Sequence, residues 1–213
     1  MRVFYVAFLD DSELRHAFDA IRLIASPREK LKTHITIRGP YPQRYRVPRA
    51  EAVVGSAKIM IQGVGCFFSA RQTTVFLEVQ SEGLIRALYK PDYPKSVPHL
   101  TLYDGPNRRF AESLYELFRS LNLVFKFKTE GLSPVVLTAG QSNFDVRLEM
   151  NGFILRQFTD LDLSVPSLVT LSDLERLQAI EEIALRMIEK GLVHGNYVKG
   201  VHLVAARHAT GGE

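Results

Sequence analysis

The sequence predicts an α+β protein in which two related lobes, each with a mostly antiparallel sheet and flanking helices, border a central groove. An order of strand, helix and histidine-bearing strand occurs twice along the chain, and no low-complexity linker divides the two occurrences. Segments rich in β-branched and aromatic residues are bounded by Gly, Pro, Ser or Asn, which favours short strands joined by turns. A C-terminal helix is expected to follow this two-lobed body.

The first unit begins with the run Arg2 to Leu9, which is typical of a strand. Ser12 and the acidic residues around it supply capping oxygens and first-turn charge for a helix, which ends at Ser26-Pro27. Apolar residues recur in this helix at helical spacing: Leu14, Ala17, Phe18, Ile21 and Ile24 or Ala25. The next strand, Lys32 to Arg38, carries His34.

The second unit repeats this order. Thr73 to Val79 alternates as a strand, Ser81 is positioned to cap a short helix, and a second strand carries His99. His34 follows Ser12 by 22 residues, and His99 follows Ser81 by 18. This agreement predicts two equivalent units.

Further elements follow the second unit. Asn107 is positioned to cap a helix, and Asn122 to Lys128 alternates apolar and basic residues like a half-exposed strand. A set of basic residues lines a groove for RNA or belongs to an ordinary surface, and the sequence leaves both interpretations open: Lys126 and Lys128 of that strand, with Lys90, Lys95, Arg108 and Arg109 around the second motif. Other strands are predicted at Ser56 to Phe68, Val135 to Ala139 and Phe144 to Met150. We assign residues 1–150 to the body and residues 151–213 to a C-terminal appendage.

The appendage contains a long helix. Ser172 and Glu175 form a capping box, and Lys190-Gly191 ends the helix. Its apolar stripe consists of Leu174, Leu177, Ile180, Ile183, Ala184 and Met187. This stripe most simply packs on the body of a monomer, with a dimer interface as the alternative. The polar tail from about residue 209 is expected to be disordered.

Composition limits the function classes. The 213 residues are 46% hydrophobic, enough for a substantial core. Apolar runs are shorter than a membrane-spanning helix requires and a signal-peptide cleavage pattern is lacking, so a cytoplasmic location is expected. The single cysteine, Cys66, excludes an intramolecular disulfide and a multi-cysteine zinc site. A net charge of +4 suits an anionic substrate but does not by itself indicate nucleic-acid binding.

Two short segments contain the candidate catalytic residues. Each places a threonine two residues after a histidine among aliphatic neighbours: His34 with Thr36, and His99 with Thr101. On a strand, a histidine and a threonine two residues apart share one face, and the aliphatic residues lie on the other. Two such strands facing one cleft offer two imidazoles and two hydroxyls to one small anion. That set suffices for metal-free acid–base cleavage of a phosphodiester.

Three neighbouring residues are candidates for substrate binding. Arg38 continues the face of His34 and is placed to give a positive charge to phosphate, or it is a solvated strand end. Tyr103 takes the matching place after Thr101, and it or Tyr41 stacks on a base or packs in the core. No metal or cofactor is expected, because three C-terminal histidines have spacings of eight and six, which fit no common ligand pattern: His194, His202 and His208.

The paired motifs resemble the two-histidine phosphoesterase superfamily, which includes the bacterial RNA 2′,3′-cyclic phosphodiesterases, also called 2′-5′ RNA ligases. The resemblance covers roughly residues 1–150 and includes the sequence Arg38-Gly39-Pro40-Tyr41 after the first motif. It implies a bilobal α+β fold and metal-independent action on 2′,3′-cyclic phosphates or 2′-5′ linkages. Residue by residue, the match extends to the four motif residues His34, Thr36, His99 and Thr101.

The chemistry of an acid–base pair leads to the same reaction. One histidine would take a proton from water and the other would protonate the departing sugar oxygen, while Thr36 and Thr101 hold the phosphate. Which of His34 and His99 is the base is left open. The alternatives are a noncatalytic module that binds RNA ends or nucleotides, and a hydrolase of small cyclic nucleotides.

Overall fold

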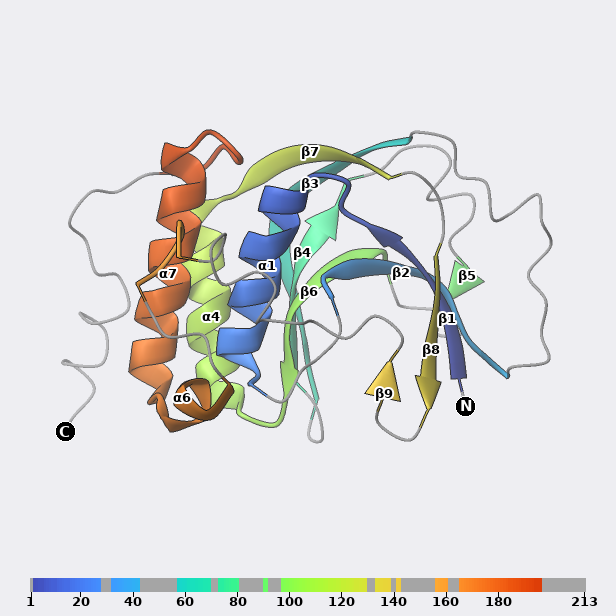
Figure 1. The fold of residues 1–213 in the computed structure, drawn as a ribbon, viewed down its shortest axis with the longest axis horizontal. Coiled ribbons are helices and arrows are strands. Elements are labelled where there is room, and N and C mark those ends of the chain that lie inside the picture. Colours follow the sequence, from blue (N-terminus) through green and yellow to red (C-terminus); the bar gives the residue numbers. More distant parts are fainter. Residues whose placement is uncertain are drawn as a thin grey trace.

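The computed structural model describes residues 2–27, 32–42, 57–69, 73–80, 90–91, 97–129, 133–138, 141–142, 156–160 and 165–196. Within them the chain forms an α+β fold of one sheet and four helices (Figure 1). The strands are β1 (Arg2–Phe8), β2 (His34–Pro42), β3 (Ala57–Phe68), β4 (Thr73–Val79), β5 (Lys90–Pro91), β6 (His99–Gly105), β7 (Val124–Thr129), β8 (Ser133–Thr138) and β9 (Gln141–Ser142). The helices are α1 (Ser12–Ala25), α4 (Arg108–Leu121), α6 (Val165–Thr170) and α7 (Asp173–Glu189).

All of these strands belong to one sheet, in the order β7-β3-β4-β6-β2-β1-β8-β9, with β5 beside β2. Neighbouring strands are antiparallel except β2 and β5. The sequence predicts a sheet for each lobe, and the structure has a continuous one because β2 joins β6 through Ile35 and Leu100. Both of these side chains are fully buried at 0% exposure, so burial favours joining the two halves.

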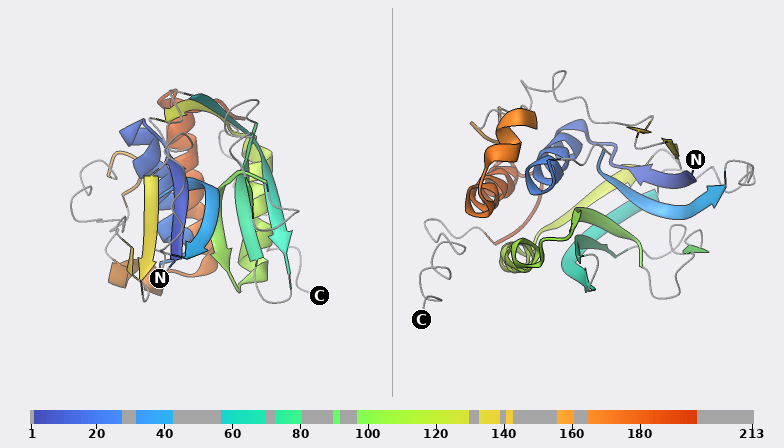
Figure 2. Two further views of the ribbon diagram at one scale, coloured as in Figure 1. Left: turned by 90° about the vertical axis from the view of Figure 1, so that its right-hand side faces the viewer. Right: turned by 90° about the horizontal axis from the view of Figure 1, so that it is seen from below.

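The helices lie on one side of the sheet. Figure 2 (left) looks onto β8, β1, β2, β6 and β4 side by side, with the helices behind them. Helix α1 packs on β6, α4 packs on β3 and β4, and α7 packs on α1 and α4. The alternate strand residues that face the helices form the core with them. We call the opposite side of the sheet the outer face.

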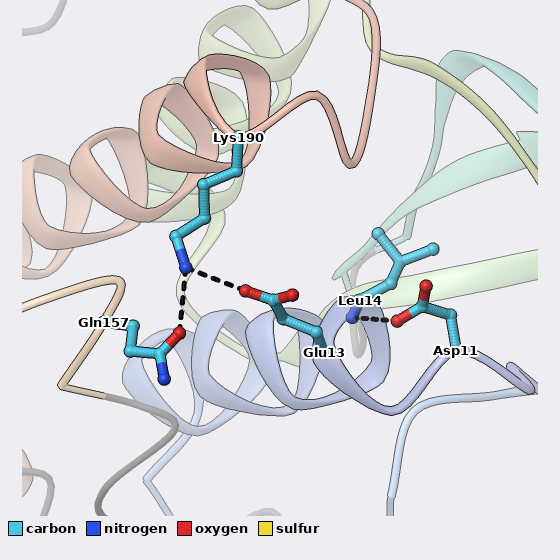
Figure 3. Close-up of polar contacts among 5 residues, drawn as sticks. All are labelled: Asp11, Glu13, Leu14, Gln157 and Lys190. Atoms are coloured by element: carbon cyan, nitrogen blue, oxygen red, sulfur yellow. Dashed lines mark hydrogen bonds and ion pairs between the residues drawn. The ribbon is translucent and has the colours of Figure 1, made fainter.

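The helix caps follow from local sequence. Asp11 caps α1, one residue before the serine that the sequence favours, and its carboxylate accepts the N–H of Leu14 at 2.9 Å (Figure 3). Asn107 caps α4, as predicted. The predicted capping box of α7 is confirmed, because Ser172 and Glu175 each bond the other's backbone N–H.

Helix α7 completes the core of the body. Its predicted stripe is buried except for Leu174, which is 39% exposed: Leu177, Ile180, Ile183, Ala184 and Met187. Beyond the end of the helix, Lys190 Nζ donates to Glu13 Oε1 at 2.8 Å and to Gln157 Oε1 at 2.9 Å (Figure 3). The appendage therefore shares one hydrophobic cluster with the body.

Most predicted elements that fall on described residues are present, with ends displaced by one to a few positions. The predicted helix at Ser81, the strand Phe144 to Met150 and the tail from about 209 lie outside the described residues. Helix α6 and strands β5 and β9 have no sequence prediction, because two to six residues are too few to show a period. Within the described part of the chain, no helix is long and apolar enough to cross a membrane.

Leu100→Ala should lower the free energy of unfolding by about 2–5 kcal/mol, because it leaves a cavity beside Ile35 where the two halves of the sheet join. Urea unfolding followed by circular dichroism measures this loss. Leu174→Ala is the matched control, since Leu174 is 39% exposed and should lose much less. Equal losses in the two variants would show that the junction is not a point of close packing.

Candidate active site

The two histidine motifs lie on neighbouring strands. The antiparallel pair Ile35 and Leu100 joins β2 to β6, so His34 and Thr36 on one strand and His99 and Thr101 on the other flank the same contact. The aliphatic pair faces the core, so the four motif side chains lie on the outer face. All four are half-buried. The register therefore relates the two motifs by a local two-fold axis perpendicular to the sheet.

Equivalent hydrogen bonds to the backbone orient the two imidazoles, each to the carbonyl oxygen two residues earlier in the chain. Nδ1 of His34 lies 2.6 Å from the carbonyl oxygen of Lys32, and Nδ1 of His99 lies 2.7 Å from that of Val97. A carbonyl oxygen only accepts, so Nδ1 is the donor in each ring. In the neutral ring the lone pair is then on Nε2, the nitrogen that can exchange protons with a ligand.

A bulge follows the threonine of each motif. The register of β1 with β2 shifts between Tyr5 and Val6, and that of β4 with β6 shifts between Val75 and Phe76. The extra residues therefore fall between Thr36 and Arg38, and between Thr101 and Tyr103. The alternation of side chains between the two faces is interrupted at these points, so Arg38 and Tyr103 do not continue the face of the motif residues as the sequence predicts.

Tyr103 is in the core and not beside His99. It is 5% exposed, its ring meets that of Phe110 edge-on at 5.2 Å, and its hydroxyl accepts the N–H of Asn107 at 2.9 Å. It lines a cavity of about 450 Å³ at the Gly105 end of β6, away from the histidine at the other end. The packing interpretation of Tyr103 is the one that these contacts support.

The structure places the other two substrate-binding candidates on β2 beyond the motif. Arg38 is 6% exposed and pairs with Tyr5 across the strands. Tyr41 is half-buried, and its ring centroid lies 6.3 Å from that of Tyr5. Gly39, which lies between Arg38 and Tyr41 in the strand, has φ +107°, and a Cβ there would come within 2.7 Å of the carbonyl oxygen of Val3. Only glycine fits this bend, which sets the path of the strand past Arg38.

Two phenylalanines beside His99 were not among the sequence candidates. The ring of Phe76 lies 4.6 Å from the imidazole, and that of Phe67 lies edge-on at 5.7 Å. Phe76 is nearly buried, whereas Phe67 is 40% exposed. Gly65 makes room for this cluster, since a Cβ there would lie 2.4 Å from the Phe76 ring. The cluster could be found only from the pairing of β3, β4 and β6, which brings distant segments together.

Burial lowers the pKa of His99 below its ordinary value, against smaller opposite effects of the Val97 hydrogen bond and the negative charge of Asp104. The neighbouring rings of Phe67 and Phe76 displace water that would stabilise the imidazolium. His99 is therefore predominantly neutral at pH 7. A neutral imidazole with its lone pair on Nε2 is equipped to accept a proton.

Three lysines line the outer face at the β7 edge of the sheet. Lys58 on β3 lies opposite Lys128 on β7, and Lys126 is two residues away on the same face of β7. All three are exposed, while the alternate residues Phe125 and Phe127 are buried in the core. Like charges directly opposite each other destabilise a strand pair, so Lys58 and Lys128 repel each other at this edge.

Comparison with protein-family models finds no match to the chain. Comparison with curated proteins also finds no match. Among the described residues, no three His, Cys, Asp or Glu side chains are grouped to hold a metal ion. His194 is exposed, and His202 and His208 lie outside the described residues. The function of the chain is therefore inferred from the geometry of the two motifs.

His99 should titrate below the ordinary value of about 6.5 for histidine in an NMR pH titration. Phe67→Ala should raise this pKa, because it admits water to the imidazole. Phe68→Ala is the control, since Phe68 lies next in the strand but contacts Arg108 at 5.3 Å. A wild-type pKa at or above 6.5 would contradict the effect of burial.

The same pKa makes stability depend on pH. His99 binds a proton more readily in the unfolded chain than in the folded one, because burial lowers its pKa in the folded protein. The stability that neutral His99 contributes to the free energy of unfolding is therefore complete above about pH 6.5. It is lost as the pH falls through the lower pKa of the folded state. Urea unfolding of wild type and His99→Gln across this range measures the difference.

Proposed function

We propose that the protein is a metal-independent phosphoesterase that hydrolyses 2′,3′-cyclic phosphate or 2′-5′ phosphodiester bonds of nucleotides or RNA ends. His34 and His99 perform the two proton transfers, and Thr36 and Thr101 donate hydrogen bonds to the phosphate oxygens. This function is the one that the resemblance of the motifs implies.

The observation that carries the proposal is the pairing of Ile35 with Leu100. It supports one shared site, because the two motifs become antiparallel neighbours with both histidines on the outer face. Binding an anion without catalysis does not require two histidines that each bond a backbone carbonyl oxygen through Nδ1. The repeated register and bulge of β1 with β2 and of β4 with β6 also support the two-lobed interpretation, with the lobes fused through this pair.

The pKa of His99 favours one division of roles. His99, neutral at pH 7, takes a proton from water through Nε2 as the water oxygen attacks phosphorus. The bond from phosphorus to the departing sugar oxygen breaks, and protonated His34 gives its Nε2 proton to that oxygen. Thr36 and Thr101 donate to the nonbridging oxygens as negative charge accumulates there. Phe67, exposed beside His99, is positioned to stack on the base of the substrate.

Incubation with cyclic mononucleotides, cyclic-ended RNA and 2′-5′ oligomers, with and without chelator, tests the proposal. We expect hydrolysis that persists in excess chelator, because the imidazoles themselves move the protons. Binding without hydrolysis of any of these would favour the noncatalytic module. Activity lost to chelator and restored by a divalent ion would overturn the mechanism.

His34→Ala and His99→Ala should each lower kcat by about 10²–10⁴-fold. The double variant should be little worse than the poorer single variant, because the two groups act in one displacement. Thr36→Ala and Thr101→Ala should weaken transition-state binding by about 1.5–3 kcal/mol each. Steady-state kinetics with a cyclic nucleotide measures all four.

His194→Ala is the matched control for the histidine variants, since this exposed residue lies in the segment after α7 and pairs with Val124 at the start of β7. It should keep wild-type activity. A folded His34→Ala/His99→Ala protein with near-normal hydrolysis would eliminate the catalytic role.

The lysines of β3 and β7 favour an RNA end over a free nucleotide. They share the outer face with His99, and β3 and β4 separate β7 from β6. Adjacent strands are about 4.8 Å apart, so Lys126 and Lys128 lie roughly 14 Å across the sheet from β6, and Lys58 lies roughly 10 Å from it. A mononucleotide bound at the histidines would not reach them, whereas the preceding nucleotides of an RNA strand would.

Replacing Lys58, Lys126 and Lys128 together by Gln should raise KM for cyclic-ended RNA and leave KM for a cyclic mononucleotide unchanged. The slope of log KM for RNA against log salt should fall by about 2, since about 0.7 counterion is released per neutralised phosphate of a single strand. Arg108→Gln/Arg119→Gln is the control, because it removes charge from exposed positions of α4, which packs on the side of the sheet opposite the outer face. Equal effects on both substrates would favour a hydrolase of small nucleotides.

A further inference from the structure

The buried side of α1 carries two charged side chains that its apolar stripe does not explain. Asp19 and Arg22 are each 5% exposed. Burying ionised groups is costly unless hydrogen bonds and opposite charge compensate for the lost water. Burial raises the pKa of Asp19, and hydrogen bonds from Thr33 and the charge of Arg22 oppose that rise. The two residues are therefore held by specific partners.

Those partners belong to a single peptide group, the one that links Lys32 to Thr33. Asp19 Oδ1 accepts the N–H of Thr33 at 2.5 Å. Arg22 Nη1 donates to the carbonyl oxygen of Lys32 at 3.2 Å. The same carbonyl oxygen accepts Nδ1–H of His34 at 2.6 Å. A peptide group is planar, so bonds at its N–H and at its oxygen together fix the direction in which that oxygen points.

We propose that Asp19 and Arg22 are positioning residues for His34. They hold the Lys32–Thr33 peptide so that its carbonyl keeps the proton on Nδ1 and aims Nε2 at the outer face. The catalytic consequence rests on the proposed function, whereas the orientation of the ring does not. Without Asp19 or Arg22 the peptide is free to rotate, and His34 loses both its fixed tautomer and its direction.

The second motif supports this inference, because the corresponding peptide there has no N–H that needs an acceptor. His99 donates to the carbonyl oxygen of Val97, and the residue that follows Val97 is Pro98. Proline has no N–H, so this peptide leaves no donor to be satisfied. Thr33 occupies the equivalent position in the first motif, is fully buried, and has an N–H that requires an acceptor. Asp19 supplies that acceptor.

The ring ¹⁵N shifts of His34 report the tautomer directly and do not depend on activity. In wild type, at a pH high enough for both rings to be neutral, we expect the Nδ1–H form for both His34 and His99. Asp19→Leu and Arg22→Met should each raise the Nε2–H fraction of His34 and leave His99, the internal control, unchanged. Asp19→Asn keeps an acceptor oxygen and should retain the wild-type tautomer.

Thr33→Pro provides the rescue, because it gives the first motif the proline of the second. Asp19→Leu/Thr33→Pro should be more stable than Asp19→Leu and should recover the Nδ1–H form of His34. If Asp19→Leu does not fold, folding of the double variant supports the inference. If neither folds, the spectrum of Arg22→Met decides.

Kinetics separates a positioning role from a structural one. With a cyclic nucleotide, Arg22→Met should lower kcat by about 10- to 100-fold, the usual effect of losing a group that orients a reacting side chain, with KM changed less than threefold. A wild-type His34 tautomer in folded Asp19→Leu and Arg22→Met would overturn the inference. An altered tautomer in a protein that hydrolyses none of the substrates would overturn the proposed function alone.

Discussion

One cross-strand contact determines where the rest of the molecule can place its chemistry. Ile35 and Leu100 pair at the centre of the sheet, and each is wholly removed from water. On either side of this contact the strands are paired over longer stretches, β2 with β1 and β6 with β4. Side chains alternate along a strand, so burying these two aliphatic residues obliges their neighbours to face outward. The position of each histidine and threonine follows from this pairing.

The sequence predicted what local patterns determine. Helices α1, α4 and α7 follow from their caps and apolar spacing, and the sharing of faces by His34 with Thr36 follows from the two-residue period of a strand. The sequence could not predict that β2 pairs with β6, because the two strands are far apart along the chain and are brought together by tertiary packing. The bulge before Tyr103 could not be predicted either, because a bulge is defined by the pairing of two strands and not by the sequence of one. Phe67 and Asp19 lacked a sequence signal for the same reason.

The two motifs are alike in backbone and different in surroundings. His99 has aromatic neighbours that reduce its hydration, whereas the peptide before His34 is tied to two buried charges. In the proposed reaction the two histidines have different roles, one as base and the other as acid. A symmetric pair of strands acquires this inequality from elements outside the motifs, with β3 and β4 on one side and α1 on the other.

The facing lysines of β3 and β7 have a consequence for the folded protein itself. Lys58 and Lys128 repel each other across a strand pair that the core residues behind them hold in register. A bound polyanion would relieve that repulsion in addition to making its own contacts. Part of the affinity for such a ligand would then come from strain already present in the unliganded sheet, and dissolved salt would relax the same strain without occupying the site.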